Sequence, residues 1–265
     1  MKSERWREVW SVKSKKQGRA MNRWVCIVFT STVFLLGILH ERLANAEPTG
    51  EQPLVVDTEK KEIQLYGVIY PERFNAARGD EAHYHLLVWH QGKSPNALIE
   101  TPADDLDFYT ALVKLGATPG NNLSMTSWTE RKDEHRTASH EKVTGSSLDI
   151  RIVWKGKYDS IPVSQLFRQS HSLTQNSELG TSNPELKWRF GGNRDRLFNK
   201  FPMLSRPGCL VCLYSCPSGK VSNAALSIHD YVTFSSHFAA NIAILPPDGT
   251  PVIMTFRLAT HERHE

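Results

Sequence analysis

The 265-residue sequence lacks the short motifs by which many enzymes are recognised. It contains no G-x-S-x-G turn of a serine hydrolase, and no H-E-x-x-H or H-x-x-E-H zinc pattern. The "SGK" at 218–220 has no upstream glycine to make a phosphate-binding loop, and "FGGNRDR" at 190–196 is not a dinucleotide fingerprint. These absences favour a non-catalytic protein over an enzyme.

Clustered basic residues are missing from most of the chain. Residues 1–46 hold nine of the 32 Lys and Arg residues and three of the 28 Asp and Glu residues, which leaves 23 basic and 25 acidic residues in the remainder. The net charge of residues 47–265 is therefore near −2. Binding to phosphate backbones needs clustered Lys and Arg, so we expect no nucleic-acid partner.

Only one long apolar run is present, "RWVCIVFTSTVFLLGIL" at 23–39, and Ala44-Asn45-Ala46 after it fits the small-x-small rule for signal peptidase. The run is short for a membrane span, which takes about 20 apolar residues. We therefore predict a signal peptide cleaved after Ala46, and a secreted or periplasmic protein. The alternative is an uncleaved anchor that holds the protein to the membrane through residues 24–39, facing outside the cytoplasm. Met21 begins a segment with the length and order of a complete secretory signal, which suggests that the true start is Met21.

Residues 47–265 are expected to form a single domain, with a polar insertion at about 121–147. Alternating apolar and polar residues predict strands, for example at 63–70, 148–157, 209–215, 240–245 and 251–257. A helix is predicted at about 102–115, with Thr101 as its N-cap and Gly116 as its stop. The predicted fold class is β-rich α+β, an antiparallel or mixed sheet with one main covering helix.

Several stretches resemble a known family when they are taken together. These are "VVDTEKKEIQLYGVIY", "HLLVWHQGKSPNALIETPADDLDFYTALVKLGATPGNN", "LKWRFGG" and "ILPPDGTPVIMTFRL". In this order they resemble the YdjY-like family over roughly residues 54–257. The resemblance implies an exported bacterial protein whose function is unassigned.

Three of the four cysteines lie within eight residues, as Cys209-x-x-Cys212-x-x-x-Cys216-Pro217. The intervening Leu, Val and Tyr favour an extended strand, in which Cys212 and Cys216 would lie about 13 Å apart at roughly 3.3 Å per residue. That separation excludes a disulfide between them or one shared metal ion. The resemblance also implies a strand over 208–217. The alternatives are a disulfide or reactive thiol, or a zinc or iron–sulfur site completed by a histidine.

His83 and His85 would share one face of a strand at 82–90, an arrangement that some metal sites use, although a solvated strand face is the simpler explanation. Asp104, Asp105 and Asp107 are explained by a helix start, where the dipole favours acids. The leading hypothesis is thus a non-catalytic binding or envelope-associated module with no cofactor and an unknown partner. The alternative is a metal-, iron–sulfur- or thiol-based redox protein that uses the three cysteines.

Overall fold

The computed structural model of the chain describes residues 47–94, 96–157, 159–170, 186–193, 206–233 and 237–259. The expected leader, with Ala44, Ala46 and the run at 24–39, lies outside the described residues. Within those ranges, no helix is long and apolar enough to cross a membrane. Export and membrane anchoring therefore stay predictions.

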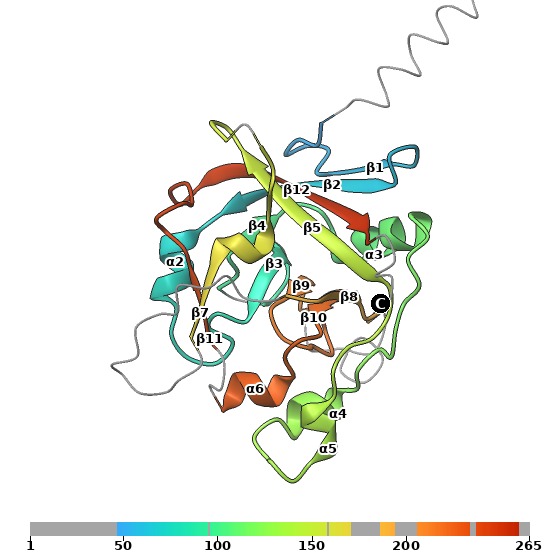
Figure 1. Cartoon of the computed structure of the whole chain (residues 1–265), viewed down its shortest axis with the longest axis vertical. Coiled ribbons are helices and arrows are strands. Elements are labelled where there is room, and N and C mark those ends of the chain that lie inside the picture. The colour runs from blue at the N-terminus through green and yellow to red at the C-terminus, as the bar shows by residue number, and fades with distance from the viewer. Residues whose placement is uncertain are drawn as a thin grey trace, which may run out of the picture. The chain divides into compact units, whose positions relative to one another are not determined.

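The described strands form one large sheet and one small ribbon (Figure 1). They are β1 (Leu54–Asp57), β2 (Glu62–Ile69), β3 (His85–Trp89), β4 (Ile99–Thr101), β5 (Ser147–Trp154), β6 (Ile161–Pro162), β7 (Phe167–Ser170), β8 (Trp188–Phe190), β9 (Cys209–Cys212), β10 (Val221–Asn223), β11 (His237–Ala240) and β12 (Thr250–Leu258). The ribbon consists of β7 and β11, which pair antiparallel.

Eight strands of the large sheet close into a barrel in the order β2, β12, β5, β8, β10, β9, β3 and β4, and β4 pairs again with β2. Two of these pairs, β9 with β10 and β3 with β4, are parallel, and the others are antiparallel. Strand β1 extends the sheet beside β2, and β6 extends it beside β5. The chain is therefore β-rich, as expected.

Alternating side chains fill the interior of the barrel. Buried and partly exposed residues alternate along β2, β5 and β12, as in strands with one face toward a core. The registers align the buried residues, since Met254 lies opposite both Leu65 and Ile152. An eight-stranded barrel is just wide enough for its own side chains to fill it, so this core needs no covering layer.

The barrel closes where β4 meets β2, and Gly67 makes that approach possible. A Cβ atom on Gly67 would lie 2.7 Å from Cγ2 of Ile99 and 3.1 Å from the carbonyl oxygen of Glu100. Real Cβ atoms do not come so close to a neighbouring strand. The missing side chain at Gly67 therefore allows the short strand β4 to complete the ring.

The prediction of an α+β sheet under one main helix at 102–115 is wrong, because the sheet closes on itself. The helix itself is present as α3 (Asp105–Lys114), and its N-cap is Asp104 instead of Thr101. Its buried Phe108 packs against Phe256 of β12, with ring centroids 4.9 Å apart. The other helices are α2 (Pro71–Ala76), α4 (Met125–Thr129), α5 (Thr137–His140), α6 (Ile228–Val232) and the 3₁₀ helix η1 (Val163–Leu166).

The structure also tests the predictions for the polar insertion at 121–147 and for a strand at 240–245. The polar insertion at 121–147 contains α4 and α5, and α5 packs against α6 through the rings of His140 and His229, whose centroids are 4.2 Å apart. The strand expected at 240–245 is wrong, because β11 ends at Ala240 and a turn follows. Strand β11 instead begins at His237, before the apolar run that suggested it.

Candidate metal centre

Three buried side chains with metal-ligating atoms meet where β3 pairs with β9. The Nδ1 atom of His85 lies 3.7 Å from Sγ of Cys209 and 3.6 Å from Sγ of Cys212. One ligand atom from each of the three residues lies within 4.8 Å of the other two. None of the three side chains is more than 2% exposed. His85 therefore does not lie on a solvated strand face.

The strand geometry expected for the cysteines is wrong in two respects. Strand β9 ends at Cys212, so Cys216 lies in the turn that follows, where it is buried. The pairing of β3 with β9 is also irregular, with register shifts between His85 and Val88. Such irregularities redirect side chains that strict alternation would place on opposite faces.

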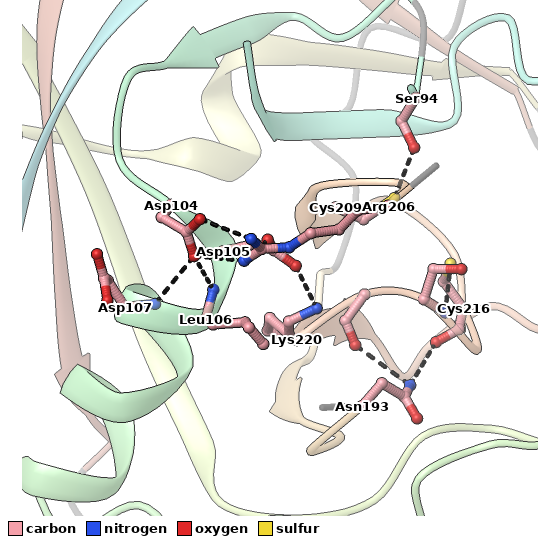
Figure 2. Close-up of polar contacts among 12 residues, drawn as sticks. Ser94, Asp104, Asp105, Leu106, Asp107, Asn193, Arg206, Cys209, Cys216 and Lys220 are labelled. Carbon is pink, nitrogen blue, oxygen red and sulfur yellow. Dashed lines mark hydrogen bonds and ion pairs between the residues drawn. The ribbon is translucent and has the colours of Figure 1, made fainter. Parts of the chain in front are cut away.

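The turn brings Cys216 back toward the other two cysteines. The Cys216 thiol influences the pKa of both Cys209 and Cys212, so the 13 Å separation calculated for an extended strand does not apply. The side-chain amide of Asn193 holds this turn, because its Nδ2 donates to the carbonyl oxygens of Cys216 (3.0 Å) and Gly219 (3.2 Å) (Figure 2). All three cysteines are free of disulfide bonds.

Glu81 and Ser94 contact the side chains of His85 and Cys209 and orient them. The Nε2 atom of His85 lies 3.0 Å from Oε2 of Glu81, which directs Nδ1 toward the thiols. The hydroxyl of Ser94 lies 2.8 Å from Sγ of Cys209 (Figure 2). Metal-bound histidines commonly donate their other ring N–H to a carboxylate in this way, which fixes the orientation of the ring.

The cluster favours a thiolate at Cys209 beside a charged imidazole. Hydrogen bonds from the thiols of Cys212 and Cys216, together with the charge of His85, hold the pKa of Cys209 well below its usual value. Burial lowers the pKa of His85, but the Cys209 thiolate and Glu81 outweigh it and raise that pKa to about 9. Burial raises the pKa of Cys212, and it raises the pKa of Cys216 to about 12. These shifts favour ionisation of Cys209 over ionisation of the other two thiols.

The spacing of these groups fits one tetrahedral ion. With Zn–S bonds of about 2.3 Å and a Zn–N bond of about 2.0 Å, tetrahedral ligands N and S lie about 3.5 Å apart. The two N–S distances here are 3.7 and 3.6 Å. Cys₃His is one of the common ligand sets of zinc. His85, Cys209 and Cys212 provide three ligand atoms that lie together, and Cys216, which is outside that 4.8 Å group, is the candidate for the fourth.

Both ends of the cysteine segment are tied to the start of α3 by buried charges (Figure 2). Arg206, before the segment, forms ion pairs with both Asp104 and Asp105, and its Nη1 lies 2.7 Å from Oδ2 of Asp104. Lys220, after the segment, places Nζ 2.6 Å from Oδ2 of Asp105. Asp105 is 1% exposed and the Lys220 side chain 5%, so this pair is shielded from water. The helix start therefore explains Asp104 only in part and Asp105 hardly at all.

Asp104 has two roles at this junction. Its side chain caps α3 by accepting from the backbone N–H groups of Leu106 (2.7 Å) and Asp107 (3.4 Å). Partial burial opposes ionisation, but the hydrogen bonds from Arg206 and from the Leu106 N–H hold the pKa of Asp104 below its usual value. The Arg206 guanidinium also lies over the Trp89 ring, 4.7 Å from its centroid. Asp107 is exposed and serves only the helix start.

Comparison with known proteins assigns the chain to a family. The YdjY domain model matches residues 54–257, which is more than half of the chain. The chain belongs to the YdjY family. It is 30% identical over 216 residues to the uncharacterized protein YdjY of Escherichia coli (strain K12), a match that covers 80% of this chain and 81% of that protein. No solved structure matches it. The resemblance inferred from the sequence is thus confirmed.

His83 and His85 do not share a strand face in this YdjY-family chain. His83 precedes β3 and has a positive φ of 59°, so its side chain leaves the strand direction. Its ring packs between Phe74 and His237, with centroid distances of 5.1 and 4.4 Å. Burial, and the nearby His237, lower the pKa of His83 to about 4. His83 therefore lies outside the cysteine cluster.

A small cavity of about 200 Å³ adjoins the cluster of the YdjY-family chain. Cys209, Cys216 and His85 line one part of it, and Tyr84 and Trp128 line another. Burial raises the pKa of Tyr84, so its hydroxyl stays protonated as a hydrogen-bond donor. The cluster can thus be reached from this cavity by a molecule of a few atoms.

Proposed function

We propose that this YdjY-family chain is a metal-binding protein that holds one zinc-type ion between His85 and the thiolates of Cys209, Cys212 and Cys216. The observation that carries the proposal is the position of His85. Its Nδ1 lies 3.7 and 3.6 Å from two thiol sulfurs, while its Nε2 is 3.0 Å from the Glu81 carboxylate. This is the arrangement of a carboxylate–histidine–metal triad.

The proposal specifies a single ion in preference to an iron–sulfur cluster. In a cluster the ligands bind different iron atoms, whereas one ligand atom each from His85, Cys209 and Cys212 lies within 4.8 Å of the other two. Zinc has no redox chemistry, so the site supports a binding module and not an electron carrier. Export stays part of the proposal, supported by the apolar run at 23–39 and the small residues Ala44 and Ala46.

The first test is metal analysis of protein purified under anaerobic conditions, with the thiols counted on the same sample. We expect about one zinc per chain, and less than about a tenth of that in His85→Ala and Cys209→Ser. Two variants serve as matched controls. His90→Ala removes an exposed histidine at the end of β3, and Ser94→Ala removes the hydroxyl beside Cys209 without removing a nitrogen or sulfur ligand. Both should keep the metal.

Two outcomes would overturn this proposal. Iron with stoichiometric sulfide would replace the single ion by a cluster. Protein that contains no metal, takes up no zinc, and shows three freely titratable thiols would leave Cys209, Cys212 and Cys216 as core residues.

A nucleophilic thiol is the second candidate function, and one observation favours it. Glu81, His85 and Cys209 are connected in the order carboxylate, imidazole and thiolate, and Cys209 lines the cavity of about 200 Å³. On this hypothesis, iodoacetamide alkylates one thiol of the metal-free protein at pH 6 much faster than the other thiols. The Cys209→Ser variant should lack this fast phase. Fast alkylation that zinc suppresses supports the metal site. Fast alkylation in protein that binds no zinc supports the nucleophile.

A further inference from the structure

A second and larger cavity, of about 1000 Å³, lies apart from the cysteine cluster. Its walls come from the end of α2 and its connection to β3, the turn after α4, the end of α6, and the β7–β11 ribbon with the turn after it. None of His85, Cys209, Cys212 and Cys216 contributes to these walls. The volume is at the upper end of the range for small-molecule sites, about 300–1,000 Å³.

Small apolar side chains keep this cavity open. Five alanines line it, together with Val232 and Ile242. The alanines are Ala77, Ala82, Ala239, Ala240 and Ala243. Larger side chains at these positions would fill the space. Ligand sites typically combine such apolar walls with a few polar groups.

The charged groups around the cavity are mainly basic. Arg78, Lys132 and Arg168 line it, against one carboxylate, Asp80. None of the three cations has an ion-pair partner among the described residues. Hydrogen bonds nevertheless hold two of them in place. Arg78 donates to the carbonyl oxygen of Ala77 (2.7 Å), and Nε of Arg168 donates to Oδ1 of Asn241 (3.1 Å). Three cations therefore face one carboxylate, and the lining of this cavity carries a net positive charge.

His83 adds a buried imidazole to the wall of this cavity. The residue is 8% exposed, and neither ring nitrogen makes a hydrogen bond of standard geometry to the residues that the structure describes, although the backbone of Phe74 and Asn75 is close enough to affect the pKa of His83. Buried polar atoms without partners are uncommon and point to a missing water or ligand. The backbone at His83, with φ of 59°, and at Glu81, with φ of 65°, is also held in a conformation that non-glycine residues rarely adopt.

We infer that this cavity binds a small amphipathic organic anion. Its apolar body lies against the alanine-lined wall, its carboxylate, sulfonate or phosphate lies at Arg78, Lys132 and Arg168, and His83 is a hydrogen-bonding group in the wall. The inference does not depend on the metal site, because the two sites share no residue.

The test uses 8-anilinonaphthalene-1-sulfonate, an apolar fluorescent anion, with decanoate as a competitor. We expect binding of one probe per chain, displaced by decanoate and at least about tenfold less well by decanol, which has the same chain without the charge. Removal of one exposed cation, in Arg78→Ala or Arg168→Ala, should weaken binding about three- to fivefold, and the double variant about tenfold or more. Ala239→Trp, which fills the cavity, should abolish binding. Protein treated with a chelator should bind the probe as untreated protein does.

Lys155→Ala is the matched control, since Lys155 is exposed on the turn after β5 and does not line the cavity. Thermal melting checks that Ala239→Trp is folded, and the arginine variants test the site if it is not. The inference is overturned by failure to bind the probe, by equal competition from decanol and decanoate, or by arginine variants that match Lys155→Ala. If the protein binds the probe as expected but does not bind zinc, the metal site is refuted and the anion site is not.

Discussion

The buried charges that flank the cysteine segment give the sharpest stability prediction. Asp105→Asn keeps the shape of the side chain and removes the charge that Lys220 and Arg206 share. Asp105 is 1% exposed and the Lys220 side chain 5%, so water cannot replace the lost partner. Removal of one member of a buried pair costs about 3–5 kcal/mol. Arg206 keeps its contact with Asp104, so we expect about 3 kcal/mol, at the low end of that range.

Urea unfolding followed by tryptophan fluorescence measures this loss. With a slope of about 2 kcal/mol per molar urea, a loss of about 3 kcal/mol lowers the midpoint by about 1.5 M. Trp89 reports on the site itself, because the Arg206 guanidinium lies 4.7 Å from its ring centroid. Asp107→Asn is the matched control. It removes an equal charge from the same helical turn at an exposed position, and it should cost less than about 1 kcal/mol.

A double variant separates lost ion pairing from a general change in packing. Asp105→Asn combined with Lys220→Met removes both charges, so it should recover much of the stability that Asp105→Asn loses. If Asp105→Asn costs no more than Asp107→Asn, the cluster behaves as a solvated surface network. The reasoning that it anchors the cysteine segment would then be refuted.

Three further predictions concern the barrel, the metal centre and the larger cavity. Gly67→Ala places a methyl group against β4 and should cost about 1–3 kcal/mol in urea unfolding. Gly50→Ala, where the nearest atom to an added Cβ is 3.9 Å away, is the control and should change stability much less. Glu81→Gln should lower the affinity for zinc about 10- to 100-fold in a competition titration, and the number of zinc ions bound per chain should stay the same. An unchanged affinity would exclude a role for Glu81 in orienting His85. The pKa of His83 is about 4 in the folded chain and about 6.5 when unfolded, because burial and then the nearby His237 lower it. The stability that neutral His83 contributes is complete above pH 6.5 and is lost as the pH falls toward 4. Wild type should therefore lose more stability between pH 7 and pH 4.5 than His83→Phe, and equal losses would contradict the pKa shift.

Elements with a clear local pattern were predictable from the sequence. The alternation at 63–70 and 251–257 corresponds to β2 and β12, and the helical spacing near 102–115 corresponds to α3. Barrel closure was not predictable in this way. It depends on three-residue strands such as β4 and on the missing side chain at Gly67, and neither produces a periodic signal. The sheet was expected to bury one face under a helix, but it closes into a barrel and buries its core inside.

The candidate metal centre illustrates a different limit. The three cysteines were visible as a cluster, but the geometry used to separate them assumed one continuous strand over 209–215. The strand ends at Cys212, and the turn signals that could have shown this, Pro217 and Gly219, lie just beyond the last cysteine. The remaining ligand, His85, is 124 residues from Cys209, and only the antiparallel pairing of β3 with β9 brings the two together.

The charged residues around the cysteine segment show that a local explanation of a residue can be incomplete. Asp104 and Asp105 fit a helix start so well that no other role for them was needed. A helix dipole is satisfied by exposed acids, however, and Asp105 is buried. Its buried charge is compensated by Arg206 and Lys220, which precede and follow the three cysteines in the sequence. A local explanation for a charged residue is therefore complete only when its exposure is known, and exposure is set by the closed barrel.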